Sequence, residues 1–289
     1  MSSPRQRNAQ VPSASRRLRF LRRSGGADVL LIAVLGGALL ASGCSRGASG
    51  GGLTVAGSTS IQPFADHWAE IYQKLHPDLV VNVQGGGSSA GIQAARSGAA
   101  QIGMSSRELK PDEKDLTAFV VARDGLAVIV HPANPLDDIG LDGVRAVFAG
   151  RIGSWDELGR GSGRITVVTR EEGSGTRGAF QEMVMRKGRI AREAIVEDSN
   201  GTVRAIVAQD PHAIGYISLG LVDPTVKALA LDGVDASDAN ILAGRYALVR
   251  PFLFVTSGTP RPDAQAFLDF ILSDDGQELV ESGGLLRAR

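Results

Sequence analysis

An arginine and two hydroxyl side chains stand between a strand pattern and a helix pattern in residues 165–185. β-Forming residues fill the first positions, and apolar residues later recur at helical spacing. Between the two patterns, Ser174 and Thr176 offer hydroxyl donors and Arg170 offers a fork of charged donors. The first turn of a helix adds backbone amides that have no partner within the helix. This stretch therefore predicts a site for a small oxyanion, with an ordinary helix cap beside a solvated arginine as the alternative.

Serine and threonine also follow three earlier strand patterns, at the points where helix patterns begin. These turns are Gly57–Ser60 after residues 53–56, Gln84–Ser89 after residues 79–83, and Ser105–Arg107 after residues 101–104. Strands that alternate with helices predict an α/β fold with a largely parallel sheet. Ligands of such sheets bind at the carboxyl ends of the strands, which is where these turns fall.

The rest of the chain continues the alternation of strands and helices. Further strands are predicted at 117–122, 125–130, 214–219, 226–231 and 246–255, and a long helix at 263–280. Pro251 interrupts the last of these strands, which suggests an edge strand or a crossover.

Residues 1–43 have the pattern of a secretory signal peptide. Arginines crowd the first 26 residues, and a run of 12 apolar residues and glycines follows at Val29–Leu40, too short to span a bilayer. Cys44, the only cysteine of the chain, comes directly after Ala-Ser-Gly. This arrangement resembles a bacterial lipoprotein signal, in which the cysteine is lipidated and becomes the first mature residue; a plain secreted protein with an incidental cysteine is the alternative. Residues 44–52 have the composition of a flexible tether.

The mature chain carries a net negative charge. The full sequence has 31 basic and 31 acidic residues, and residues 1–43 contain seven of the basic ones and one acidic one, which leaves a net charge of −6. A field of this sign does not attract nucleic acid, so any anion must be held by local donors. There is no Gly-Lys-Ser/Thr phosphate loop, and the four histidines share no metal-ligand spacing. Neither a cofactor nor a metal is expected.

Gly87–Gly91 matches the G-x-S-x-G pattern and lies between a strand and a helix, as the nucleophile of a serine hydrolase would. A serine esterase that uses Ser89 is therefore an alternative function. Few strands precede the motif, however, and only His131 and His212 follow it, each beside a proline in a turn-like context.

Several segments together resemble the phosphate-specific substrate-binding proteins of ABC transporters. They include GSTSIQPFADHWAEIY, VQGGGSSAGIQAARSGAAQIGMSSREL, DGLAVIVHPANPL, TREEGSGTRGAF, SNGTVRAIVAQDPHAIGYISLG and FLDFILSDDGQELV. The resemblance implies a two-lobed periplasmic-binding-protein-like α/β fold with two hinge crossovers and the ligand in the interlobe cleft, which closes by a hinge motion. Lobe 1 is expected to comprise residues 53–131 and 248–289, and lobe 2 residues 132–247.

The resemblance also implies the phosphate contacts, carried over position by position. They are Thr59 and Ser60 on the first turn, Ser88 on the second, Ser106 on the third, and Arg170, Ser174, Gly175 and Thr176 on the fourth. Glu172 falls where the family often has an acid that pairs with the binding arginine. In the best-known branch an aspartate stands at the position of Ser106 and accepts the proton that phosphate carries and sulfate lacks. Because a hydroxyl can also donate, Ser106 should reject sulfate less sharply.

The function implied by the resemblance is high-affinity binding of inorganic phosphate and its delivery to a membrane permease of an ABC transporter. The protein would be a monomer without enzymatic activity, exported and lipid-anchored through Cys44 to the cell membrane, facing the periplasm or the cell exterior. Binding of another tetrahedral oxyanion, such as sulfate or molybdate, is an alternative. A surface lipoprotein that kept the fold as a sensor or adhesin is another.

Overall fold

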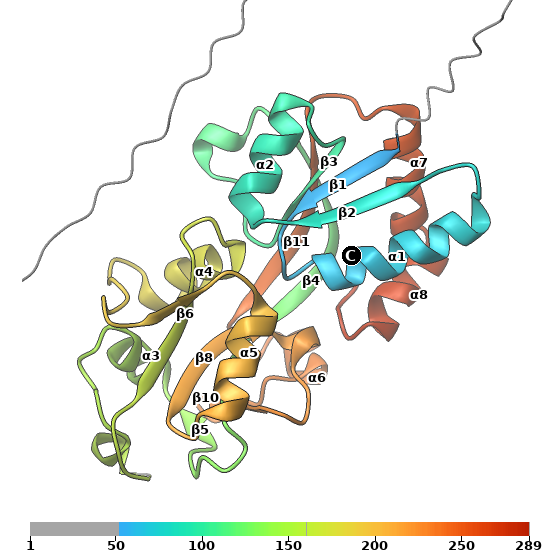
Figure 1. The fold of residues 1–289 in the computed structure, drawn as a ribbon. Coiled ribbons are helices and arrows are strands. Elements are labelled where there is room, and N and C mark those ends of the chain that lie inside the picture. Colours follow the sequence, from blue (N-terminus) through green and yellow to red (C-terminus); the bar gives the residue numbers. More distant parts are fainter. Residues whose placement is uncertain (1–51, 160, 289) are drawn as a thin grey trace, which may run out of the picture. The chain divides into compact units, whose positions relative to one another are not determined.

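The computed structural model describes residues 52–159 and 161–288. Its internal contacts divide the chain into two units, Met1–Gly47 and Ala48–Arg289, and the fold described below belongs to the second (Figure 1). The predicted signal peptide, the lipidation site Cys44 and the predicted tether as far as residue 51 lie outside the described residues.

One mixed sheet runs through this unit in the strand order β2-β1-β3-β11-β4-β8-β6-β7, with β9 also paired with β4. The strands are β1 Leu53–Gly57, β2 Val81–Gly85, β3 Ile102–Ser105, β4 Thr117–Val130, β6 Thr166–Arg170, β7 Ile195–Glu197, β8 Ala213–Ser218, β9 Lys227–Ala228 and β11 Val249–Thr256. β5 (Asp138–Ile139) and β10 (Ala230–Leu231) form a separate parallel pair. β1 is parallel to β2 and β3, and β6 is parallel to β7 and β8, so each group presents its carboxyl ends at one edge.

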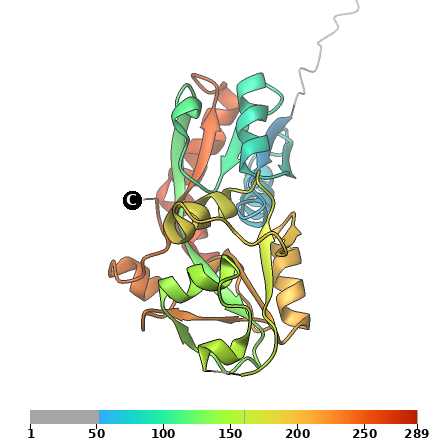
Figure 2. The same ribbon diagram turned by 90° about the vertical axis from the view of Figure 1, so that its left-hand side faces the viewer.

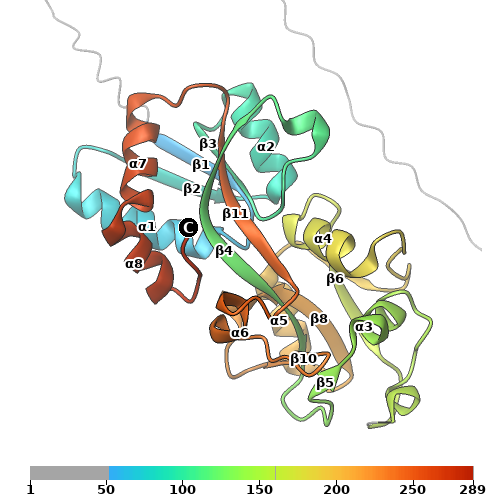
Figure 3. The ribbon, with the colours of Figure 1, turned by 180° about the vertical axis from the view of Figure 1, so that it is seen from behind.

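The antiparallel strands β4 and β11 connect these two parallel groups (Figure 3). β11 lies between β3 and β4 in the sheet, so of the two predicted possibilities the edge strand is wrong, and β11 instead crosses between the two groups of strands. Pro251 is tolerated because β3 pairs only with Leu253–Val255, which leaves Pro251 without a β3 partner. β4 pairs with β11 as far as Gly125 and with β8 from Leu126 onward.

Alternation of side chains along β11 decides which helices cover each face of the first group. Phe252 and Phe254 pack in a cluster with α1 (Gln62–Leu75), α7 (Pro262–Leu272) and α8 (Asp274–Ser282). The intervening Leu253 and Val255 pack instead with α2 (Ser88–Ser97). Trp68 on the apolar stripe of α1 is buried in the first cluster.

Alternation of side chains along β4 likewise decides which helices cover each face of the second group of strands, β6, β7 and β8. Its even-numbered residues 126–130 pack with α3 (Leu141–Phe148), α4 (Gly175–Phe180) and α6 (Asp238–Leu242). Its odd-numbered residues Ala127 and Ile129 pack with α5 (Asn200–Gln209). Figure 2 shows α5, in orange, on the other side of these strands from α3. Both groups thus have a sheet covered by helices on both faces, which confirms the predicted α/β class.

Several predicted elements have different extents in the structure, and the strand expected at 226–231 is divided into β9 and β10. The strands expected at 117–122 and 125–130 form the single strand β4. The helix expected at 263–280 is divided at Ser273, whose backbone is extended and whose hydroxyl accepts the Gly276 amide at 3.1 Å as the cap of α8.

Candidate functional site

Three of the predicted turns meet through a cluster of serines. Ser58 Oγ, on the turn after β1, donates to Ser106 Oγ at 2.9 Å. The Ser106 amide, after β3, donates to Ser88 Oγ at the start of α2, at 3.1 Å. All three side chains are buried. They come together because β1, β2 and β3 are parallel neighbours whose carboxyl ends share one edge.

The turn before α4 packs directly against this serine cluster. A Cβ atom on Gly175 would lie 2.1 Å from Ser88 Oγ and 2.5 Å from Ser106 Oγ, so only glycine permits this approach. The Ser89 amide also donates to the Gly173 carbonyl at 3.1 Å. The structure therefore brings the fourth predicted turn to the other three.

Ser60 joins residues from three other elements. Its hydroxyl lies 2.6 Å from Thr176 Oγ1, accepts a hydrogen bond from Asn200 Nδ2 at 2.8 Å, and accepts another from Arg250 Nη2 at 3.3 Å. Its amide donates to Ser58 Oγ at 3.2 Å. Ser60 thus links the turn after β1 to α4, α5 and β11.

Arg170 ends β6 and is 1% exposed. Its Nε and Nη2 donate to the Glu171 carboxylate at 3.0 and 3.1 Å, and Nη2 also donates to Thr59 Oγ1 at 3.0 Å. Carbonyl oxygens of Glu197 and Asp198 accept further hydrogen bonds from the same guanidinium. Its orientation is therefore fixed from several sides.

The remaining nitrogen of this guanidinium, Nη1, is buried without a hydrogen-bond partner. In the part of the chain that the structure describes, it is the only buried side-chain nitrogen or oxygen in that condition. A buried charged donor without an acceptor is costly, so an oxyanion that accepts from Nη1 would be bound favourably.

The acid that pairs with Arg170 is Glu171, so the expectation that Glu172 does so is wrong. Glu172 is exposed and lines a surface hollow with Arg107, Lys110 and Arg186. The alternative interpretation of the turn is correct in one respect, since Ser174 Oγ caps α4 by accepting the Arg177 amide at 3.2 Å. The arginine beside this cap is nevertheless buried and not solvated.

Sequence reasoning missed a buried ion pair behind Ser60. Arg250 Nε and Nη2 donate to Asp124 Oδ2 at 3.0 and 2.8 Å, and Ser218 Oγ donates to Asp124 Oδ1 at 2.7 Å. The Ser218 amide in turn donates to Asn200 Oδ1 at 3.2 Å. Burial raises the pKa of Asp124, and the charge of Arg250 and the Ser218 hydrogen bond oppose that shift. Ser60, Arg250, Asp124, Ser218 and Asn200 thus close a buried ring of hydrogen bonds.

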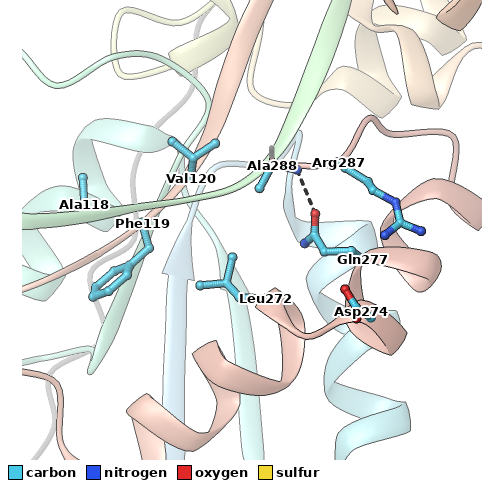
Figure 4. Close-up of a pocket in the computed structure, with 8 residues that line it drawn as sticks. All are labelled: Ala118, Phe119, Val120, Leu272, Asp274, Gln277, Arg287 and Ala288. Carbon is cyan, nitrogen blue, oxygen red and sulfur yellow. Dashed lines mark hydrogen bonds between the residues drawn. The ribbon is translucent and has the colours of Figure 1, made fainter.

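A separate cavity lies elsewhere and contains none of the predicted site residues. It has a volume of about 610 Å³ and is lined by residues of β4, α7, α8 and the C-terminal segment (Figure 4). In Figure 4 the Gln277 side chain accepts the Ala288 amide, a bond of 2.8 Å that ties the C-terminal segment to α8.

Among the described residues, no histidine forms a hydrogen bond with Ser89, as the base of a serine esterase would. The Ser89 amide is bound to Gly173, and His131 Nδ1 accepts the Ala133 amide of its own turn at 3.0 Å. Within residues 52–159 and 161–288, no three His, Cys, Asp or Glu side chains gather as metal ligands. No helix in this described part is both long and apolar enough to cross a membrane.

Comparison with known proteins gives consistent matches. Residues 42–275 match the family model of a PBP superfamily domain. The phosphate-binding protein PstS of Bacillus subtilis (strain 168) is 37% identical over 235 residues, which cover 80% of this chain and 78% of that protein. The PstS protein of Pseudomonas aeruginosa (strain PAO1) is 30% identical over 268 residues, which cover 82% of this chain and 83% of that protein.

Solved structures agree with the sequence matches. A phosphate ABC transporter substrate-binding protein of Clostridium perfringens, described with bound phosphate, has a TM-score of 0.80 and 39% identity over 82% of this chain and 100% of that chain. An ABC-type phosphate transport receptor of Vibrio cholerae has a TM-score of 0.69 and 35% identity, and the match covers 81% of this chain and 99% of that chain. The chain therefore belongs to the PBP superfamily and, within it, to the family of the PstS phosphate-binding proteins.

Proposed function

We propose that this chain binds inorganic phosphate outside the cytoplasm and delivers it to the membrane permease of an ABC transporter. The observation that carries the proposal is Arg170 Nη1, a buried charged donor without a partner, next to turns rich in hydroxyl groups. The names of the relatives and the phosphate bound in the Clostridium perfringens structure support phosphate as the ligand.

Eight residues would form the phosphate site in this proposal, by contact with the ion or with a residue that contacts it. They are Thr59, Ser60, Ser88, Ser106, Arg170, Ser174, Gly175 and Thr176. Arg170 supplies the positive charge, and the hydroxyls and turn amides supply dipoles. Micromolar binding corresponds to a net gain of about 8 kcal/mol after the ion has been dehydrated. Such a gain favours a closed and dry cleft, which agrees with the burial of Arg170, Ser88 and Ser106.

Sulfate is the second candidate ligand, and Ser106 is the residue that favours it. Ser106 Oγ accepts a hydrogen bond from Ser58 Oγ and lies 3.4 Å from Ser88 Oγ, so its own proton can be donated to Ser88 or to a bound ion. An acceptor-only carboxylate at this position would repel sulfate, whereas a donating hydroxyl does not. We therefore expect measurable sulfate binding beside tighter phosphate binding.

Calorimetric titration with phosphate and sulfate tests the proposed function. The exported, processed protein is expected to bind phosphate, and Arg170→Met or Thr176→Val should each weaken binding at least ~100-fold, because each removes a donor to a charged ligand. Arg204→Met is the matched control, since Arg204 pairs with the half-exposed Asp223 on the surface. Binding in both site variants equal to that of the unmodified protein would reject the site, and absence of phosphate binding in the unmodified protein would reject the function.

We further propose that Cys44 carries a lipid that anchors a monomeric protein to the cell membrane. Two lobes, residues 53–131 with 248–289 and residues 132–247, would close over the ligand by a hinge motion in β4 and β11. Replacement Cys44→Ser should move the protein from the membrane fraction to the soluble fraction of a bacterial host. Unchanged membrane association would contradict the anchor.

A further inference from the structure

The hydroxyl oxygen of Ser60 receives two hydrogen bonds whose direction is fixed. Arg250 has donors only, so its contact with Ser60 is a donation. Asn200 could present either end of its amide, but its Oδ1 accepts the Ser218 N–H at 3.2 Å, which turns Nδ2 toward Ser60. A hydroxyl oxygen has two lone pairs, and both are therefore occupied.

Ser60 must then donate its own proton, and Thr176 Oγ1 is 2.6 Å away. Because Thr176 Oγ1 accepts the hydrogen bond from the Ser60 hydroxyl, the Thr176 hydroxyl can donate its own proton to another acceptor. We infer that Asn200 and Arg250 are positioning residues that make the Thr176 hydroxyl a donor toward the bound oxyanion, and so set which oxyanions the site prefers. This inference rests on the proposed function and concerns the same site.

The hydrogen bonds that run from Asn200 and Arg250 through Ser60 to Thr176 form a relay. Burial of these residues protects the direction of this relay. Ser60, Thr176, Asn200 and Arg250 are each at most 3% exposed, so water has little access to supply other partners. Charged groups near them include Arg170 with its partner Glu171, Arg250 with its partner on β4, and Arg177, which donates to the Arg170 carbonyl. Because Asp124 offsets the charge of Arg250, the effect of Arg250 on Ser60 is chiefly one of hydrogen-bond direction.

A donating Thr176 favours ligand oxygens that carry no proton. Every oxygen of sulfate is of that kind, whereas phosphate near neutral pH keeps at least one proton. Compared with a Thr176 hydroxyl that accepts a hydrogen bond from the ligand, the relay therefore raises the affinity for sulfate relative to phosphate. Asn200→Asp should reverse it, because one carboxylate oxygen can accept the Ser218 N–H and the other can accept the Ser60 proton. Ser60 would then accept from Thr176, and Thr176 would become an acceptor suited to a protonated oxygen.

The test is the ratio of phosphate to sulfate affinity, measured by calorimetry at one pH and ionic strength. We expect the ratio to rise about tenfold in Asn200→Asp and by an intermediate amount in Asn200→Ala, where the direction of the Ser60–Thr176 bond is no longer fixed. Asn134→Asp is the matched control, because Asn134 is a buried asparagine whose Oδ1 also accepts a backbone amide, that of Leu136. Its ratio should stay that of the unmodified protein.

The same substitution in a Ser60→Ala variant distinguishes an effect of the relay from an effect of the new negative charge at position 200. In Ser60→Ala the relay is broken, so adding Asn200→Asp should no longer change the ratio. Persistence of the change in that background would overturn the inference, and so would an unchanged ratio in both Asn200→Asp and Asn200→Ala. Each of these results requires an unmodified protein that binds phosphate, whose failure to bind would instead reject the proposed function.

Discussion

Arg170 Nη2 donates to Thr59 Oγ1 at 3.0 Å, although the two residues are 111 positions apart. Thr59 belongs to the turn after β1, and Arg170 ends β6 in the other parallel group of strands. The contact therefore holds the buried arginine against a turn that follows a strand of the opposite group. A ligand that binds Nη1 of this guanidinium would be coupled to both groups at once.

Loss of this contact should weaken phosphate binding without unfolding the protein. In Thr59→Val the guanidinium keeps its bonds to Glu171 and Asp198, so Arg170 stays in place but loses its link to the first turn. We expect roughly a tenfold loss of affinity by calorimetry. Thr54→Val, on the neighbouring strand β1, should bind as the unmodified protein does. Equal affinities of the two variants would contradict the role of Thr59.

Removing the charge of Glu171 should strengthen phosphate binding. The Arg170 guanidinium retains Thr59 and two carbonyl oxygens as acceptors, so it should remain oriented in Glu171→Gln while the net charge of the site becomes more positive. The gain should be roughly threefold and larger at low ionic strength, because salt screens a partly exposed charge. Glu172→Gln is the control, since this exposed acid has no bond to Arg170. A weaker binding of Glu171→Gln at every salt concentration would mean that orientation outweighs charge.

A methyl group at position 175 should keep the turns apart. In Gly175→Ala the new Cβ would meet Ser88 Oγ at 2.1 Å and Ser106 Oγ at 2.5 Å, and moving these hydroxyls would break the serine cluster. We expect more than tenfold weaker phosphate binding and, because buried hydroxyls lose their partners, a lower melting temperature in the absence of ligand. In Gly201→Ala the nearest atom would be Ser199 Oγ at 3.7 Å, an ordinary contact, so that variant should bind normally. Normal binding by Gly175→Ala would argue against a closed site.

The buried pair of Arg107 and Glu113 should make stability depend on pH. The hydrogen bond from Arg107 lowers the pKa of Glu113 below its usual range. A lowered folded-state pKa gives stability that is fully present above the unfolded pKa of about 4.3 and is lost as the pH falls through the folded pKa. Glu113→Gln should therefore cost roughly 3 kcal/mol at pH 7, a difference that shrinks in strong acid.

Thermal or urea unfolding across pH measures this dependence. Asp115→Asn is a suitable comparison, because Asp115 pairs with Arg96 at the surface and should matter little. A stability difference between Glu113→Gln and the unmodified protein that stays constant from pH 7 into strong acid would contradict the assignment.

The sequence predicts the site turns well because strand ends and helix starts carry local signals. Arg170, Ser174 and Thr176 lie within one such segment, and hydrophobic periodicity places it at a strand end. The choice between Glu171 and Glu172 could not be made in this way, because adjacent side chains diverge at a strand end according to the local backbone. The structure settles it in favour of Glu171.

The ring behind Ser60 could not be predicted, because its members are far apart in the chain. Asp124 and Arg250 are separated by 126 residues and meet only through the pairing of β4 with β11. One local signal was available: Arg250 is the only charged residue in the apolar run Tyr246–Val255. A charge within a buried strand requires a partner, although the sequence does not say which.

A crystal structure of the protein with phosphate tests the central claim most directly. We expect one phosphate ion in contact with Arg170 Nη1, within hydrogen-bond distance of Thr176 Oγ1 and of the Ser88 and Ser106 turns. A phosphate bound elsewhere, or Nη1 paired with a protein atom while phosphate is bound, would contradict it.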